Sequence, residues 1–320
     1  MWKAEYTPTS GKMGCMKGHV LILTANILFG ISMPVFKYLL TSDFPPEAIT
    51  YMRAAFACAM FWIVSFFVVP GERVPPKDLG LLAVCGLCGV GFNQWLFVTG
   101  LRSSSPVDAS IIATAVPIFV LLLAAVVLKE PITAKKSAGV LLGVGGGLLL
   151  VYSSAHAMDG ESSLKGDMLM LLNQMLYSVY LVLSKPLSLH YSPVTVMKWM
   201  FLFSALTLTP FCLRHLQEVP VFHRETFDGM ELCALLYLLT GTTFLSFLLI
   251  PVALKYIRPT TVSMYNYVQP IVASGIAVLI GQDTFSLQKL TAAVLVFAGV
   301  WLVTRSKKRN KINRKKRPVL

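Results

Sequence analysis

Charged residues are scarce in this chain. Asp, Glu, Lys and Arg make up only 13% of its 320 residues, whereas a soluble domain carries roughly 25%. Hydrophobic residues make up 55% and the mean hydropathy is +0.68. Uncharged runs reach the roughly 20 residues that a helix needs to cross a bilayer. This composition excludes an ordinary soluble protein and predicts an all-α integral membrane protein in a lipid bilayer.

Acidic residues are the rarer of the two charges, and none lies deep inside a hydrophobic segment. The chain has 15 Asp and Glu against 28 Lys and Arg. Proton coupling through a buried carboxylate would require such a residue at membrane depth. The sequence therefore gives no candidate for that type of coupling.

Cysteine and histidine are too scattered to suggest a chemical site. Cys85 and Cys88 form a CxxC pair, but it lies in a hydrophobic segment with no nearby His and no βαβ pattern. We read this pair as small packing residues. The five His are far apart, and HExxH, GxSxG and paired acidic motifs do not occur. We expect no metal and no other cofactor, and a membrane-embedded enzyme is a remote alternative.

The net charge of +13 is concentrated at the C-terminus. Nine of the 28 basic residues fall within residues 305–317. A basic run that directly follows a hydrophobic helix typically binds anionic lipid headgroups. We therefore expect contact with the bilayer and no nucleic-acid partner.

Ten hydrophobic segments are predicted to cross the membrane. They cover residues 19–40, 46–69, 79–99, 107–128, 136–153, 167–184, 194–213, 231–253, 261–281 and 286–304. With both termini in the cytoplasm, twenty Lys and Arg lie on the cytoplasmic side and six on the other. This asymmetry agrees with the positive-inside rule and predicts cytoplasmic termini.

The chain is an internal duplication. Residues 101–149 overlay residues 254–302 at a shift of 153, and an earlier stretch repeats at a shift of 148, which places Asn26 on Gln174. Each copy contains five predicted spans, and an odd number forces the second copy to enter the membrane from the opposite side. The sequence thus predicts two inverted repeats related by a pseudo-two-fold axis in the membrane plane. The predicted divisions are a tail at 1–17, repeats at 18–155 and 165–306, and a basic tail at 307–320.

One ordered pattern occurs once in each copy. In the first copy it comprises Gly100-Leu101-Arg102, Pro106, Ser110, Pro117, Glu130 and Gly139. In the second it comprises Ala253-Leu254-Lys255, Pro259, Ser263, Pro270, Asp283 and Gly299. This doubled pattern resembles the drug/metabolite transporter superfamily, specifically ten-helix exporters with two EamA-type domains. The resemblance covers about residues 18–306.

The resemblance implies a secondary transporter of an inner or plasma membrane that works by alternating access. Its implied substrate is a small metabolite, such as an amino acid or a related amphiphilic solute, moved outward. The sequence departs from the family pattern at Asp283-Thr284, and Arg53 has Phe201 as its repeat partner. A sugar-phosphate or nucleotide-sugar antiporter is the alternative. It would need clustered basic residues, for which only Arg53 and Lys198 qualify. The sequence leaves the oligomeric state open.

Arg53 is the basic residue furthest inside a predicted span, roughly 10 Å deep at 1.5 Å per residue. It either snorkels to the headgroups or provides a counter-charge for an anionic substrate group. Amide and aromatic residues complete the predicted substrate pathway, with packing between helices as their alternative role. They are Asn26, Asn93, Trp95, Gln174, Tyr177, Tyr265, Asn266 and Gln269. Pro117 and Pro270, at equivalent mid-span positions, are predicted points of flexibility.

Three other pairs or series are predicted to be structural. Lys37 and Lys185, near the predicted ends of equivalent segments, are expected to be interfacial anchors. Glu130 and Asp283 are expected to cap the turns that follow them. Gly139, Gly143 and Gly147 form a small-residue stripe suited to helix packing, since the Lys and Ser/Thr of a phosphate-binding loop are missing.

Overall fold

The structure is a computed structural model that describes residues 12–101, 112–154, 164–219, 229–279 and 287–306. All regular structure within these ranges is helical. The first repeat contains α1 (Lys12–Thr41), α2 (Pro46–Val68), α3 (Pro76–Gly86), the π-helix η1 (Leu87–Gly91), α4 (Phe92–Leu101), α6 (Val116–Val127) and α7 (Ala134–Ser154). The second contains α8 (Leu164–His190), α9 (Pro193–Cys212), η3 (Leu213–Glu218), α10 (Gly229–Leu236), the π-helix η5 (Tyr237–Leu245), α11 (Ser246–Tyr256), α12 (Pro259–Met264), η6 (Tyr265–Tyr267), α13 (Val268–Leu279) and α14 (Leu287–Thr304).

Several helices begin where the sequence places a proline. Pro46, Pro76, Pro193 and Pro259 are the first residues of α2, α3, α9 and α12. Proline suits this position because the first amide groups of a helix have no partner within it and the ring already fixes a helical φ.

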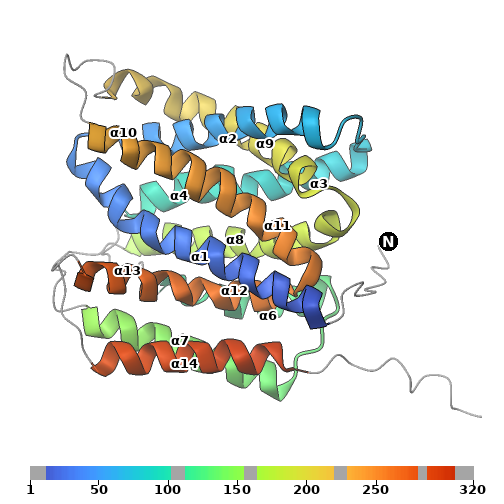
Figure 1. The fold of residues 1–320 in the computed structure, drawn as a ribbon, viewed down its shortest axis with the longest axis vertical. Helices are drawn as coiled ribbons and strands as arrows, with labels where there is room; N and C mark the ends of the chain where they lie inside the picture. Colours follow the sequence, from blue (N-terminus) through green and yellow to red (C-terminus); the bar gives the residue numbers. More distant parts are fainter. Residues whose placement is uncertain (1–11, 102–111, 155–163, 220–228, 280–286, 307–320) are drawn as a thin grey trace, which may run out of the picture.

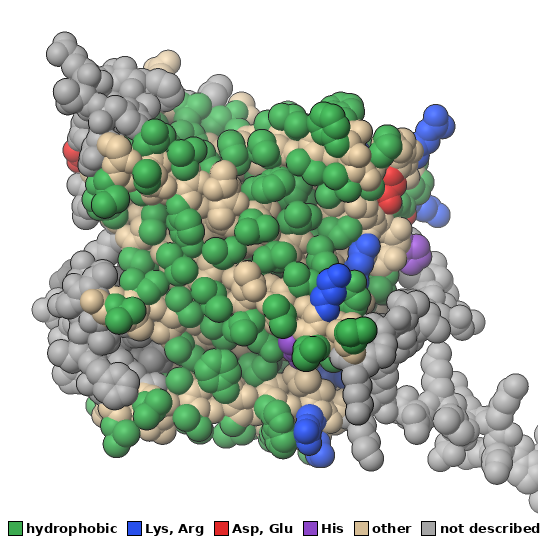
Figure 2. Space-filling model, viewed as in Figure 1, with side chains coloured by type: hydrophobic (Ala, Val, Ile, Leu, Met, Phe, Trp, Pro, Cys, Tyr) green, Lys and Arg blue, Asp and Glu red, His purple; other side chains and the backbone are tan. Residues whose placement is uncertain are grey.

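The outer surface of the bundle is apolar. Six helical stretches of the described chain are long and apolar enough to cross a membrane, and Val116–Val127 and Leu290–Thr304 are shorter apolar helices. Phe67 and Val126 are 82% and 78% exposed, and hydrophobic side chains cover most of the face in Figure 2. On that face the described Lys and Arg gather at the end where α1 begins and α14 ends. A surface of this kind is suited to lipid.

The equivalent helices α1 and α8 run through the middle of the molecule (Figure 1). Segments α2, α3–α4, α9 and α10–α11 lie on one side of them, and α6, α7, α12–α13 and α14 lie on the other. The main hydrophobic core includes buried residues from both repeats, among them Phe61, Tyr180, Phe201 and Met264.

The packing of α7 on α14 shows the pseudo-two-fold symmetry directly. A Cβ built on Gly299 would lie 2.6 Å from the Gly139 carbonyl oxygen, and one built on Gly146 would lie 2.8 Å from that of Ala292. Shifting by 153 places Gly139 on Ala292 and Gly146 on Gly299, so the two contacts are the same contact seen from each repeat. Gly143 and Gly147 of the predicted stripe instead pack on Tyr267. The predicted packing role of the stripe is therefore confirmed.

The fourth segment of each repeat is interrupted at the same place. A turn at Thr114–Ala115 precedes α6, and η6 interrupts α12 and α13. The Tyr267 hydroxyl donates a 2.7 Å hydrogen bond to the carbonyl oxygen of Thr114, its own repeat partner. Pro117 and Pro270 lie in the first turns of α6 and α13, where a missing amide proton costs no helical hydrogen bond. The prolines therefore begin half-helices and do not kink continuous ones.

The third segments are also alike, because each contains a π-helical stretch. At a shift of 153, η1 falls on residues 240–244, inside η5. Short π-helices are rare and frequently lie at functional sites. Because they occur at equivalent positions in both repeats, the third segments on the two sides of the pseudo-two-fold axis both depart from regular α-helix.

The prediction for Lys185 is wrong. Helix α8 continues to His190, and Lys185 is only 5% exposed. Its ammonium donates hydrogen bonds to the carbonyl oxygens of Leu254 and Ile257, at the C-terminal end of α11. These carbonyls have no partner within their own helix, so a buried lysine can satisfy them. The side chain of Lys37 and the whole of Asp283 lie outside the described residues.

Glu130 was predicted to cap the turn that follows it, and the structure shows its carboxylate in contacts between two helices. Its carboxylate accepts a 2.5 Å hydrogen bond from the Lys136 ammonium and a 3.2 Å hydrogen bond from the Thr260 hydroxyl. The ion pair is largely buried, with Lys136 only 1% exposed. Glu130 thus joins the start of α7 to the start of α12.

Candidate functional site

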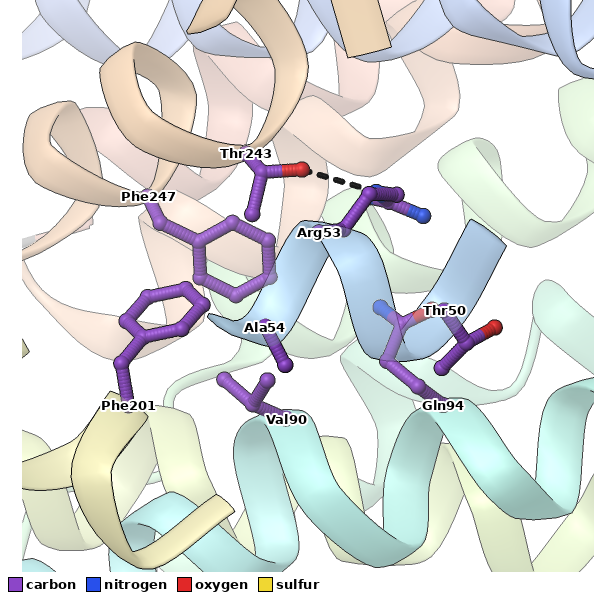
Figure 3. Close-up of a pocket in the computed structure, with 8 residues that line it drawn as sticks. All are labelled: Thr50, Arg53, Ala54, Val90, Gln94, Phe201, Thr243 and Phe247. Atoms are coloured by element: carbon purple, nitrogen blue, oxygen red, sulfur yellow. Dashed lines mark hydrogen bonds between the residues drawn. The ribbon is translucent and has the colours of Figure 1, made fainter. Parts of the chain in front are cut away.

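A small pocket lies between the third segments of the two repeats (Figure 3). Arg53 extends from α2 and donates a 2.7 Å hydrogen bond from Nε to the Thr243 hydroxyl of η5. The other residues that line the pocket are Thr50, Ala54, Val90, Gln94, Phe201 and Phe247.

This pocket lies on the pseudo-two-fold axis. Six of its eight lining residues form three repeat pairs: Arg53 with Phe201 at a shift of 148, and Val90 with Thr243 and Gln94 with Phe247 at a shift of 153. Val90 and Thr243 belong to the two π-helical stretches. A pocket lined by equivalent positions of both repeats is the place where transporters of inverted-repeat architecture bind their substrates.

Although the positions are symmetric, their chemistry is not. The first repeat contributes an arginine, an amide and a hydroxyl through Arg53, Gln94 and Thr50, whereas the second contributes Phe201 and Phe247 and one hydroxyl, that of Thr243. The pocket therefore has a polar side and an aromatic side. An amphiphilic solute would bind there in one orientation.

The Arg53 guanidinium has no acidic partner among the described residues; its hydrogen bond is to a neutral hydroxyl. A charge at membrane depth costs about 2.5–3.5 kcal/mol on insertion scales and usually faces a partner or a cavity. Arg53 faces the pocket, so an anionic group there would supply the missing counter-charge.

The pocket is small in this conformation. Its cavity volume is about 10 Å³, which is room for about one water molecule. Four phenylalanines pack tightly beside it, with ring centroids 4.6 Å apart for Phe61 and Phe244 and 5.4 Å apart for Phe61 and Phe201 and for Phe201 and Phe247. A solute larger than a few heavy atoms would require the repeats to move apart.

Five of the predicted pathway residues meet in a second polar cluster around η6. Gln269 Nε2 donates a 2.8 Å hydrogen bond to Asn26 Oδ1, which joins α13 to α1. Tyr177 of α8 lies beside the side chain of Asn266, and the Tyr265 hydroxyl lies 2.9 Å from Nδ1 of His19. These contacts connect both central helices to the interrupted segment, so packing accounts for much of their polarity.

The other three predicted residues lie elsewhere. Asn93 and Asn173 form a reciprocal pair in which each side-chain amide donates to the other residue's carbonyl oxygen, at 3.0 and 2.5 Å. Trp95 packs against Phe211 with ring centroids 5.7 Å apart. Gln174 accepts a hydrogen bond through its backbone carbonyl from Ser178. None of these three is among the residues that line the pocket.

The pathway prediction omitted several polar residues of the site. Gln94 follows Asn93 directly, but one sequence does not show which of two adjacent amides faces a cavity. Thr50 is the one threonine of α2, whereas Thr243 is one of three threonines in η5 and has Val90 as its repeat partner. The distinguishing signal for Thr243 is its proximity to Arg53, which only the folded chain shows.

The helical architecture, the apolar surface and the central pocket define a membrane transporter with inverted repeats. The model of the EamA-like transporter family matches residues 16–152 and 164–305. The chain therefore belongs to the EamA-like transporter family. The prediction of an all-α membrane protein with two inverted five-helix repeats is confirmed.

Relatives and a solved structure agree with this assignment. An uncharacterized transporter of Archaeoglobus fulgidus is 27% identical over 90% of this chain and 97% of its own length. A protein of Salmonella typhimurium named a probable amino-acid metabolite efflux pump is 25% identical over 89% of this chain and 94% of its own length. A crystal structure with 20% identity superposes with a TM-score of 0.72 over 92% of this chain and 99% of that one.

Proposed function

We propose that this transporter exports a small amphiphilic metabolite that carries a carboxylate, such as an amino acid. The observation that carries the proposal is the pocket on the pseudo-two-fold axis, where Arg53 has no acidic partner among the described residues and shares the lining with two phenylalanines. The carboxylate would bind the guanidinium, and the apolar part of the solute would pack on Phe201 and Phe247.

Arginine suits this role because its planar guanidinium presents several donors in a fork that matches a carboxylate. Thr243 holds Nε of Arg53, which fixes the plane of the guanidinium and leaves its terminal nitrogens to a ligand. Gln94 and Thr50 provide donors and acceptors for a second polar group, such as an amino group.

Alternating access would come from relative movement of the repeats around this pocket. The interrupted fourth segments, the π-helical third segments and the glycine contacts of α7 with α14 occur in both repeats. Each repeat can therefore adopt the arrangement that the other has, which closes one side of the pocket and opens the other. We further propose a plasma-membrane or inner-membrane location with both termini in the cytoplasm, which the distribution of basic residues supports.

The sugar-phosphate or nucleotide-sugar alternative has less support. A phosphate group carries up to two negative charges, and Arg53 is the single cation among the residues that line the pocket. The name of the Salmonella relative also points to amino-acid metabolites.

A counterflow assay tests the proposal. Purified protein is reconstituted in liposomes that are preloaded with one unlabelled L-amino acid, and entry of the same radiolabelled amino acid is measured across a panel. We expect entry above that of protein-free liposomes for at least one amino acid with an apolar side chain, and none for its amide, which lacks the carboxylate. Exchange of sugar phosphates in the absence of any amino-acid exchange would overturn the proposal.

A further inference from the structure

A second buried cation lies one helical turn from the pocket. Lys198 of α9 is 9% exposed, and its ammonium lies 5.1 Å from the centre of the Trp62 ring of α2. No carboxylate of the described residues forms an ion pair with it. Lys198 precedes Phe201 by three residues, so the two side chains lie on the same face of α9, and Phe201 lines the pocket of Arg53.

Buried polar atoms of Trp62 and of two residues close to Lys198 along α9 also lack hydrogen-bond partners within the described structure. The indole Nε1 atoms of Trp62 and Trp199 are buried and have no hydrogen-bond partner within the described structure, and the Thr195 hydroxyl is in the same state. The Trp62 and Trp199 rings lie 5.3 Å apart at an interplanar angle of 74°. Thr195 precedes Lys198 by three residues, on the same side of α9. Buried donors in native proteins almost always have a partner, so a group of unpaired ones calls for an absent acceptor.

We propose that Lys198, Trp62, Trp199 and Thr195 form a second anion-binding site, which takes the carboxylate of an organic solute. The ammonium and the two indole N–H groups are donors, and a carboxylate is an acceptor on both of its oxygens. The aromatic rings provide an apolar surface for the rest of the solute. A single ammonium balances one negative charge, which fits a carboxylate better than a phosphate dianion.

The site has a defined relation to Arg53. At a shift of 148, Lys198 is the repeat partner of Thr50, which lines the central pocket. Each repeat thus provides one cation on equivalent helices, one turn apart in register. Because the repeats are inverted, Arg53 and Lys198 approach the centre from opposite ends. If the proposed function holds, a transported carboxylate would meet Lys198 and Arg53 in succession on its way through the protein. Carboxylate binding at Lys198 does not depend on the proposed function.

Intrinsic tryptophan fluorescence provides the test. The purified protein in lipid-free detergent is titrated with 3-phenylpropanoate, and in parallel with 3-phenylpropanamide, which has the same shape without the charge. We expect a saturable fluorescence change with the carboxylate alone. Lys198→Met should weaken its apparent affinity by about tenfold to a hundredfold, because a hydrogen bond to a charged group is lost. Lys198→Arg, which keeps the charge, should restore most of it.

Trp301 of α14 and Arg305, which directly follows that helix, provide a matched control. Arg305 lies 4.7 Å from the Trp301 ring centre, but both residues are exposed. Arg305→Met should leave the titration unchanged, and Trp62→Phe should remove most of the signal. Melting temperature and gel filtration establish that each variant is folded.

Three results would overturn the proposal. They are an unchanged affinity in folded Lys198→Met, an equal response to the amide, and a response lost in Arg53→Met but kept in Lys198→Met. The last result would assign the ligand to the central pocket. If the wild-type protein binds 3-phenylpropanoate as expected but shows no amino-acid exchange in the counterflow assay, the proposed function alone is rejected. A titration in phosphatidylcholine nanodiscs, with and without phosphatidylserine, tests the source of the carboxylate. Suppression by phosphatidylserine would show that a lipid headgroup occupies the site in place of a soluble solute.

Discussion

At the residue scale, the central question is whether Arg53 contacts substrate or anchors α2 at the membrane surface. The structure favours contact, because Arg53 lines the pocket and its guanidinium donates a hydrogen bond from Nε to Thr243 of the other repeat. A snorkelling arginine would place its charge in the aqueous interface.

Replacement of Arg53 by lysine tests this role. Lysine keeps the charge and has a similar cost of insertion into the membrane, but it cannot form the two-pronged hydrogen bond to a carboxylate. We expect KM for the exported solute to rise about tenfold, which corresponds to the loss of one charge-assisted hydrogen bond. Membrane level and melting temperature should stay close to wild type. The exposed Arg305→Lys is the control, and full activity in Arg53→Lys would identify Arg53 as an anchor.

Asn266 provides a second test at this scale, because its position beside Tyr177 of α8 gives it a packing role as well. Asn266→Leu should lower transport per folded molecule if the amide faces the route of the solute. If it only joins helices, its loss should cost about 0.6 kcal/mol of stability, up to about 1.7.

Tyr177→Phe separates these two roles, since it removes the polar group beside Asn266 and leaves the amide in place. Uptake and melting temperature are measured on the same purified samples. We expect Asn266→Leu to reduce transport more than Tyr177→Phe does. Equal losses of stability with intact transport in both variants would assign Asn266 to packing alone.

At the scale of the elements, close approach of α7 and α14 holds the fifth segments of the two repeats together. This contact depends on glycine, because a Cβ on Gly299 would lie 2.6 Å from the Gly139 carbonyl oxygen and 2.9 Å from the Gly143 amide nitrogen. Backbone atoms cannot move aside as a flexible side chain can, so the two helices would have to separate.

We therefore expect Gly299→Ala to destabilise the protein by about 1–3 kcal/mol, as overpacking typically does. Gly145→Ala is the matched control, since a Cβ there would meet no other atom within 4 Å. It should be neutral or stabilising, because alanine favours helix over glycine by about 0.5–1 kcal/mol. Thermal unfolding of both variants in the same detergent measures the difference. An equal melting temperature for the two variants would show that the α7–α14 contact is not tight.

The elements also show how much of this fold could be predicted. The number of spans and the duplication were predictable, because hydrophobic runs and a fixed repeat shift are properties of the sequence itself. The break at Tyr265–Tyr267 was not, because it is stabilised by contacts with α1, α7 and α8. Lys185 was predicted at a helix end for a similar reason. Only the folded chain shows that α8 extends to His190 and that the carbonyls of α11 lie beside Lys185.

The same limit applies to the candidate site. Arg53 was predictable because a charge inside an apolar run is conspicuous in any sequence. The amides were predicted as a single group, but they divide between the cluster at η6, the Asn93–Asn173 pair and the pocket. Each amide's location depends on the direction in which its side chain leaves the helix. Adjacent residues such as Asn93 and Gln94 point about 100° apart, and the neighbouring π-helix changes these directions further.

At the scale of the whole molecule, a symmetric scaffold carries an asymmetric site. The repeats share the interrupted helices and the π-helical stretches, which allows them to exchange conformations. The pocket between them is polar on the side of the first repeat and aromatic on the side of the second. A solute bound there as proposed would keep one orientation relative to the first repeat while access alternates from one side of the membrane to the other.

The inverted arrangement makes a definite prediction about topology. Five spans separate the loop that contains residues 159–161 from the C-terminus, so the two must lie on opposite sides of the membrane. The loop at 73–77 follows two spans and should lie on the same side as both termini.

A phosphatase reporter that is active only outside the cytoplasm, fused within 159–161, should be active, whereas fusions after Leu320 or within 73–77 should be inactive. A fluorescent protein that folds only in the cytoplasm should give the opposite result at each position. If the 159–161 and Leu320 fusions report the same side, an even number of spans lies between them, and the second repeat cannot be inverted relative to the first.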